Sequence, residues 1–136
     1  MELEIREIYM SDTWPIRHEV MWPDQPFSFV KLEEDNIGKH YGLFVKGVLT
    51  SIVSVFIKDN ELQFRKLATL NHEQGKGYGT KLLKFVLNEA GAFGVRRIWC
   101  NARVDKSAYY DRFGLTETGQ KYVKGGIEFV VMEKNF

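Results

Sequence analysis

Apolar and polar residues alternate along the chain first with the period of a strand and then with that of a helix. Residues 2–9 place Leu and Ile on one face and charged residues on the other, which predicts a half-buried strand. Apolar residues then recur at helical spacing, and they predict a helix at about 13–22 with Ser-Asp-Thr at 11–13 as its N-cap. Pro15 suits the first turn of that helix. A short helical turn is expected within residues 31–37.

The middle of the chain is predicted to form a meander followed by the longest helix. Residues 41–47 and 49–57 are rich in Val, Leu, Ile and Phe and flank a Lys-Gly turn, which favours a hairpin. Residues 61–70 continue it as a third strand. Residues 76–93 carry an apolar face opposite a face with lysines, as an amphipathic helix does. A strand is expected at 97–102.

The last part of the chain completes the predicted sheet. A short helix at 105–113, capped by Asp105, precedes strands near 115–122 and 127–134. The strand, long helix and strand near the middle imply one parallel crossover in an otherwise antiparallel sheet. We therefore predict an α+β fold in the order β-α-(α)-β-β-β-α-β-α-β-β, with residues 1–136 as a single domain.

Composition narrows the class of protein. A chain of 136 residues, 44% of them apolar, can fill one core. A net charge of +1 argues against a nucleic-acid partner. No apolar run approaches the length of a membrane span, and the acidic N-terminus is unlike a signal peptide. The single cysteine, Cys100, excludes an internal disulfide, is expected to be a packed thiol, and suits a cytoplasmic protein.

The two halves of the chain differ in charge. Residues 1–68 carry eight Lys and Arg against eleven Asp and Glu, whereas residues 69–136 carry eleven against seven. Two interpretations stay open: the asymmetry arises by chance, or the second half binds an anionic ligand.

The most informative segment is Gln74–Thr80, with the sequence QGKGYGT, between a predicted strand and the long helix. Glycines at alternate positions let backbone N–H groups converge, and a helix N-terminus adds free donors and partial positive charge. These features predict a phosphate or pyrophosphate site. Thr80 adds a hydroxyl, and Lys76 adds a nearby cation. The spacing fits neither the GxxxxGK[ST] loop nor the GxGxxG dinucleotide fingerprint.

The same segment resembles a known family. Gln74–Gly79 is similar to the [Q/R]-x-x-G-x-[G/A] signature of the GNAT superfamily of acyl-CoA-dependent N-acyltransferases. Ala108–Leu115, AYYDRFGL, is similar to the family's A-x-x-FY-x-x-x-GF region, with the alanine moved closer. The resemblance implies a GNAT-like fold and an acetyl-CoA-dependent N-acetyltransferase without a metal. It departs at Thr69 and Asn71, where many members have Val and Pro.

The resemblance also implies roles for particular residues. Backbone N–H groups of the strand end would bind the pantetheine arm and polarise the thioester. The glycine loop would hold the pyrophosphate. Tyr110 would be the general acid toward the coenzyme A thiolate, and Tyr109 is assigned to packing. The implied cofactor-binding residues are Leu67, Ala68, Thr69, Gln74, Gly75, Lys76, Gly77, Tyr78, Gly79, Thr80 and Asn101.

The general base and the acceptor stay open at this stage. His72 and Glu73 lie beside the cofactor loop, and Glu61, Gln63 and Arg65 lie on the strand before it. The charges of Arg65 and Lys66 leave two alternatives open, repulsion of a cationic acceptor or attraction of an anionic one. Neither His18 nor His40 has a partner at metal-ligand spacing. The acceptor region implied by the resemblance is 14–38 and 116–130, where Glu19, Asp24, Glu33 and Glu34 suggest a primary amine of a small molecule or peptide.

Three functions compete on the sequence: an active acetyltransferase, a non-catalytic acyl-CoA sensor of the same fold, and a nucleotide-binding regulatory domain. An intact glycine loop and Tyr110 favour the enzyme, and the motif mismatches disfavour the nucleotide-binding domain. The oligomeric state, including a homodimer, is left open.

Overall fold

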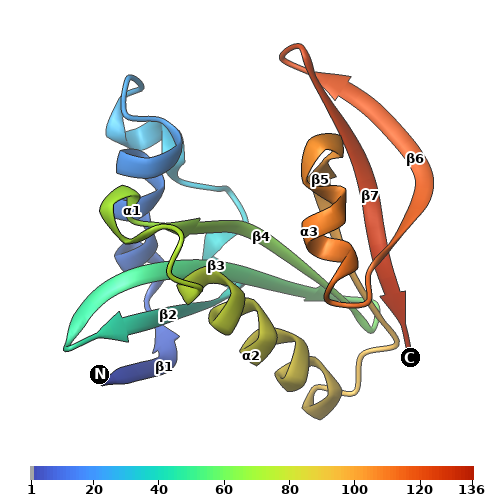
Figure 1. The fold of residues 1–136 in the computed structure, drawn as a ribbon, viewed down its shortest axis with the longest axis horizontal. Coiled ribbons are helices and arrows are strands. Elements are labelled where there is room, and N and C mark those ends of the chain that lie inside the picture. The colour runs from blue at the N-terminus through green and yellow to red at the C-terminus, as the bar shows by residue number, and fades with distance from the viewer. Residues whose placement is uncertain (1) are drawn as a thin grey trace.

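Within residues 2–136, which this computed structural model describes, seven strands form one sheet in the order β1-β2-β3-β4-β5-β7-β6 (Figure 1). The strands are β1 (Leu3–Ile8), β2 (Lys39–Val45), β3 (Val48–Lys58), β4 (Glu61–Thr69), β5 (Arg97–Arg103), β6 (Thr116–Lys124) and β7 (Ile127–Asn135). The α-helices are α1 (Met10–Met21), α2 (Tyr78–Ala92) and α3 (Ser107–Asp111). Short 3-10 turns are η1 (Phe27–Val30), η2 (Asp35–Ile37), η3 (Asn71–Glu73) and η4 (Val104–Lys106).

The sheet separates between β4 and β5. These two strands pair in parallel only where Glu61–Gln63 face Arg97–Trp99. All other neighbouring strands of the described chain are antiparallel, so the prediction of one parallel crossover is confirmed. Beyond Gln63, β4 keeps β3 on one edge, and its other edge has no strand partner among the described residues.

A bulge interrupts β4 where the two strands part. Ile52 pairs with Ala68 and Ser54 pairs with Arg65, so two residues of β4 face the single residue Val53. Lys66, one of those two, has φ 59°, which is left-handed and uncommon for a residue with a side chain. The sequence analysis missed this bulge because no glycine marks it.

Helices cover both faces of the sheet. Val53 packs in the core cluster under α2, whereas its neighbour Ile52 packs with Ile16 of α1. Successive residues of a strand point to opposite faces, so α1 and α2 lie on opposite faces. The apolar face predicted for the long helix is buried in α2, where Leu82, Leu83, Val86 and Ala90 are buried. In Figure 1, α1 and the β6–β7 hairpin stand on either side of β4.

Two predicted helix starts are wrong. The first helix begins at Met10, with Tyr9 as N-cap, rather than at 13. Asp12 lies inside its first turn and accepts the Tyr9 N–H through Oδ2 at 3.0 Å, so this carboxylate caps the helix from the N3 position. The C-terminal short helix begins at Ser107 with Lys106, not Asp105, as N-cap. The other predicted elements agree to within about two residues, the usual scatter of boundaries.

Candidate functional site

Two hollows lie where β4 leaves β5. The first, the loop cavity, has a volume of about 570 Å³ and lies between the glycine loop, the end of β4 and α3. The second, the strand cleft, has a volume of about 210 Å³ and lies between β4, β5 and the β6–β7 hairpin. Leu67 and Tyr110 line both hollows, and among residues 2–136 they are the only ones common to the two.

The loop cavity gathers most of the residues expected to bind a cofactor. Lys76 lies instead on a neighbouring hollow, and Asn101 lines the strand cleft. Asn101 is exposed within β5, opposite Val131. The expected residues that line the loop cavity are Leu67, Ala68, Thr69, Gln74, Gly75, Gly77, Tyr78, Gly79, Thr80 and Tyr110.

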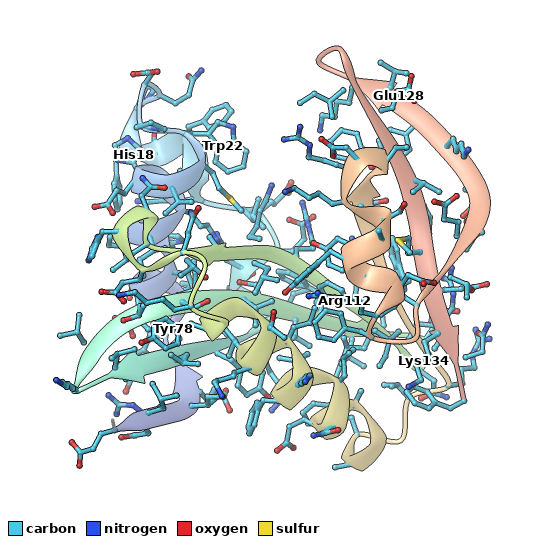
Figure 2. The ribbon with its side chains drawn as sticks, in the orientation of Figure 1. His18, Trp22, Tyr78, Arg112, Glu128 and Lys134 are labelled. Atoms are coloured by element: carbon cyan, nitrogen blue, oxygen red, sulfur yellow. The ribbon has the colours of Figure 1, made fainter. Side chains whose placement is uncertain are left out.

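The glycines of the loop serve two different purposes. Gly75 and Gly77 have φ of +81° and +85°, in the left-handed region where side chains are disfavoured. Gly77 is the N-cap of α2, and the first helical turn that follows it lines the cavity with its backbone. A Cβ on Gly79 would lie 3.3 Å from Thr69 Oγ1, so glycine there lets helix and strand approach closely. Figure 2 shows Tyr78 at this N-terminal end of α2.

The side chains of Gln74 and Lys76 form hydrogen bonds to neighbouring residues of the loop and of the end of β4. The Gln74 amide donates to the Thr69 carbonyl at 3.0 Å and to Asn71 Oδ1 at 3.3 Å. Lys76 Nζ donates to Glu73 Oε2 at 3.0 Å, and this hydrogen bond raises the pKa of Lys76. Gln74 therefore clamps the loop to the end of β4, a positioning role that the motif alone did not reveal.

The free edge of β4 presents backbone groups to the loop cavity. Leu70 N–H donates to the Thr50 carbonyl at 3.0 Å, so that amide faces β3. Because backbone groups alternate along a strand, the amides of Thr69 and Leu67 face the opposite edge. The Thr69 carbonyl on that edge accepts the Gln74 amide, which agrees with this assignment. The Thr69 side chain is turned toward Ser51, with 2.9 Å between their hydroxyl oxygens.

The two tyrosines of α3 differ in their surroundings. The Tyr109 hydroxyl lies 3.0 Å from Thr80 Oγ1 and its ring lines the loop cavity, so Tyr109 does more than pack. The Tyr110 ring lies between Phe64 and Tyr109, with ring centroids 5.9 and 5.2 Å away. Burial, with smaller contributions from Cys100 and Tyr109, raises the pKa of Tyr110 far above its ordinary value. Its phenol is therefore protonated at neutral pH.

Comparison with known proteins identifies the family. The family model described as acetyltransferase (GNAT) domain matches residues 22–136. The chain belongs to the GNAT acetyltransferase family. It is 32% identical over 142 residues to a Bacillus subtilis (strain 168) protein named "Uncharacterized N-acetyltransferase YitI", covering 97% of this chain and 95% of the relative.

Solved GNAT structures share the fold along the whole chain. A putative N-acetyltransferase from Lactobacillus plantarum superposes with a TM-score of 0.88 at 15% identity, covering 99% of each chain. A PaiA N-acetyltransferase from Thermoplasma acidophilum, in complex with coenzyme A, superposes with a TM-score of 0.76 at 16% identity and 100% coverage of both. The predicted GNAT-like α+β fold is therefore confirmed.

In this GNAT protein, the residues of the segments where a general base was expected lie in different places. Glu61 pairs with Arg96 and Arg97 at 2.8 and 3.1 Å, at the far end of β4. Glu73 lines the loop cavity, and His72 is 72% exposed with Nε2 3.8 Å from the Glu73 carboxylate. The remaining two candidates, Gln63 and Arg65, line the strand cleft.

Several cleft residues were not singled out from the sequence. Lys124, Tyr122 and Phe129 of the β6–β7 hairpin line the strand cleft. The strand predicted near 115–122 ends before Lys124, so the placement of Tyr122 and Lys124 on one strand was not predicted. Cys100 is 3% exposed and burial raises its pKa to about 12, so the expectation of a packed thiol is confirmed.

Among residues 2–136, no group of three or more His, Cys, Asp or Glu side chains could hold a metal ion. In the same range, no helix combines the length and apolar character needed to cross a membrane.

Proposed function

We propose that this GNAT protein transfers an acetyl group from acetyl-CoA directly to a primary amine of a small molecule or peptide. The observation that carries the proposal is the meeting of two hollows at Leu67 and Tyr110. Acetyl-CoA bound in the loop cavity and an amine bound in the strand cleft would contact each other only beside Leu67 and Tyr110. We further propose that residues 1–136 act as one acetyltransferase domain.

The backbone around the loop cavity suits the parts of acetyl-CoA. The N–H groups at Gly75–Thr80 converge at a helix N-terminus, which favours a pyrophosphate. The Leu67 and Thr69 amides lie on the free edge of β4 and would pair with the pantetheine arm as a neighbouring strand does. Ala68 lies between them in this segment. The coenzyme A complex of the Thermoplasma acidophilum relative supports this choice of donor.

The other residues expected to bind the cofactor would position the glycine loop or contact parts of acetyl-CoA. Gln74 would hold the loop against Thr69, Lys76 would add positive charge near the phosphates, and Tyr78 would anchor the first turn of α2. Thr80 can accept the Tyr109 hydroxyl and still donate to a phosphate oxygen. Asn101 lies beside Tyr110 in the strand cleft, so its proposed contact is with the thiol end of the pantetheine arm.

The transfer itself needs an oxyanion donor and a proton for sulfur. A neutral amine attacks the thioester carbonyl carbon, a C–N bond forms, and the backbone N–H groups of β4 stabilise the oxyanion. The C–S bond then breaks, and the protonated Tyr110 phenol donates to the leaving sulfur. The amine nitrogen releases one proton to water, and water returns one to Tyr110. The protein is therefore regenerated.

A second candidate function is an acyl-CoA sensor of the same fold. One observation favours it: within the described part of the chain, no Asp or Glu lines the strand cleft to take a proton from an ammonium group. Calorimetry with acetyl-CoA, ATP and NAD tests the donor, and thiol release with a panel of amines tests turnover. We expect binding of acetyl-CoA alone and thiol release with at least one amine. Binding without release from any amine would favour the sensor.

The composition of the chain supports a proposal about its compartment and its class of partner. A single free thiol and a net charge of +1 suit a cytoplasmic protein whose partner is a small amine or peptide rather than nucleic acid. A membrane partner is not part of the proposal, and a homodimer remains compatible with it.

A further inference from the structure

Cations line the strand cleft, and none of the described residues that line it carries a carboxylate. Its three charged residues are Arg65, Lys66 and Lys124. Lys66 lies in the bulge of β4, Arg65 directly precedes it, and Lys124 lies at the end of β6, so the positive groups approach the cleft from both of its walls. A small cleft with this charge pattern is suited to an anionic ligand.

These cations are poorly neutralised by the protein. Arg65 has Glu34 at 3.6 Å, a pair in which both side chains are partly in solvent and which is therefore weak. Within residues 2–136, neither Lys66 nor Lys124 has a carboxylate within 4.0 Å. Lys66 Nζ instead lies 4.5 Å from the ring centroid of Trp22. Figure 2 shows Trp22 at the end of α1, on the side toward the β6–β7 hairpin.

The backbone keeps Lys66 in this crowded position. The residue adopts a left-handed φ of 59°, which costs a non-glycine residue energy. Burial, followed by repulsion from Arg65, Arg17 and Lys124, lowers the pKa of Lys66 to about 8, while Asp35 acts in the opposite direction. An anion bound among these groups would offset the repulsion between their like charges.

The rest of the cleft suits a small organic molecule. Tyr122 stacks on Phe129 with ring centroids 5.3 Å apart and an interplanar angle of 13°. Both rings line the cleft and offer an apolar wall. Each water molecule occupies about 30 Å³ in the liquid. The cleft volume of about 210 Å³ is therefore large enough for several waters, or for a ligand of amino-acid size.

We propose that the acceptor is an amine that also carries an anionic group, a carboxylate or a phosphate, bound by Arg65, Lys66 and Lys124. This inference rests on the proposed acetyl transfer. The acceptor amine would lie near Leu67 and Tyr110 and the anion nearer the lysines. Of the acidic residues expected to draw in a cationic amine, Glu19, Asp24 and Glu33 line neither hollow, and the fourth, Glu34, lies against Arg65.

Matched acceptors test the anion directly. Thiol release is measured for phenylalanine against phenylalaninamide, glycine against glycinamide, and phosphoethanolamine against ethanolamine. We expect the anionic member of at least one pair to have a kcat/KM higher by roughly tenfold, the scale of one hydrogen bond to a charged group. The first two pairs report a carboxylate and the third a phosphate. Turnover without preference in any pair would overturn the inference and leave acetyl transfer intact.

Variants of one strand assign the effect to the cleft. Lys124→Gln should raise KM for the preferred anionic acceptor by roughly tenfold, leave its neutral partner unchanged and leave kcat largely unchanged. Lys121→Gln is the matched control, because Lys121 is exposed on the same strand and does not line the cleft. Equal effects of the two variants would contradict the assignment.

A binding measurement keeps the test independent of turnover. Calorimetry of the coenzyme A-loaded protein compares N-acetylphenylalanine with N-acetylphenylalaninamide, and N-acetylphosphoethanolamine with N-acetylethanolamine. Tighter binding of an anionic product, lost in Lys124→Gln, supports the inference even if no acceptor turns over. Equal affinity within both pairs, or no binding of any product, overturns it. Failure of the proposed function is seen separately, because no amine would then release thiol from acetyl-CoA.

Discussion

The Tyr109 hydroxyl lies 3.0 Å from Thr80 Oγ1, which joins α3 to the first turn of α2 beside the glycine loop. Tyr109→Phe removes this hydrogen bond and leaves the ring contacts with Tyr110 and Phe113 in place. We expect the free energy of unfolding to fall by about 1 kcal/mol, the net value of one hydrogen bond. Affinity for acetyl-CoA should fall a few-fold and kcat should stay unchanged.

A double-mutant cycle separates the pair from its surroundings. Thr80→Val removes the other partner, and the double variant should be less destabilised than the sum of the two single changes. Denaturant unfolding measures the three free energies. Strict additivity would mean that the two hydroxyls do not interact in solution.

Gly77 offers a test of phosphate binding in which charge alone is varied. The residue is the left-handed N-cap of α2, a conformation that Asn and Asp tolerate better than other side chains. Gly77→Asp places a carboxylate where the pyrophosphate is proposed to bind, whereas Gly77→Asn has the same shape without the charge. Calorimetry should show acetyl-CoA binding lost in the Asp variant and partly kept in the Asn variant. Equal affinities would put the phosphates elsewhere.

The order of elements along the chain and the glycine loop could be predicted from the sequence because both rest on local patterns. Apolar periodicity marks each strand and helix, and the left-handed Gly75 and Gly77 are written in the chain as glycine. The bulge at Lys66 could not be predicted, because a residue with a side chain occupies the left-handed position and only the pairing of Ile52 and Ser54 reveals it.

The strand cleft could not be predicted for a different reason. Its walls come from segments far apart in the sequence, and the side chain of Lys124 approaches Lys66 only because β7 lies between β5 and β6 in the sheet. The placement of Asn101 depends on the same arrangement. Motif comparison therefore located the donor side of the site, and tertiary structure was needed for the acceptor side.

A buried ion pair fixes the segment between α1 and β2. Arg17 donates to both oxygens of Asp35 at 2.8 and 2.9 Å, and the pair is almost fully buried. Asp35→Ala should lower the free energy of unfolding by about 3–5 kcal/mol, because an unpaired guanidinium remains in the interior. Glu33→Ala, at an exposed neighbouring position, is the control and should change it by less than about 0.5 kcal/mol. Thermal and urea unfolding measure both variants.

The same pair predicts a response to acid. Burial alone raises the pKa of Asp35, but hydrogen bonds from Arg17, Leu32 and Trp14 outweigh it and hold the pKa below its ordinary value of 3.8. The stabilisation is therefore complete above pH 3.8 and is lost as the pH falls through the lower folded value. Wild-type stability should drop in that range more steeply than that of Asp35→Ala.

Lys66 predicts how acceptor binding depends on alkaline pH. Its pKa of about 8 means that the ammonium is present below pH 8 and is progressively lost above it. KM for an anionic acceptor should therefore rise between pH 7 and 9, whereas KM for its neutral amide should not rise with it. Lys66→Met should have a high KM for the anionic acceptor at every pH. An identical pH profile in this variant would exclude Lys66 as the titrating group.

The lowered pKa of Lys66 makes the folding stability rise with pH, whereas the binding of an anionic acceptor weakens with pH. An unfolded lysine titrates near 10.5, so between pH 8 and 10.5 the unfolded chain binds more protons at this position than the folded chain. Lys66 therefore opposes folding below pH 8, and its unfavourable contribution is relieved as the pH rises through that window. Lys66→Met should be more stable than wild type at pH 7, with a smaller difference at pH 10.

Tyr110 provides the most direct test of the chemistry. Its ring packs between Phe64 and Tyr109, so Tyr110→Phe removes the hydroxyl and leaves these contacts in place. If the phenol donates to the leaving sulfur, kcat and kcat/KM should both fall by roughly 10²-fold while acetyl-CoA affinity stays the same. Single-turnover thiol release measures the chemical step. Tyr109→Phe, one residue away on the same helix, should keep its kcat. Full turnover by Tyr110→Phe would mean that water protonates the thiolate, and a larger loss in Tyr109→Phe would assign the acid to the neighbouring tyrosine.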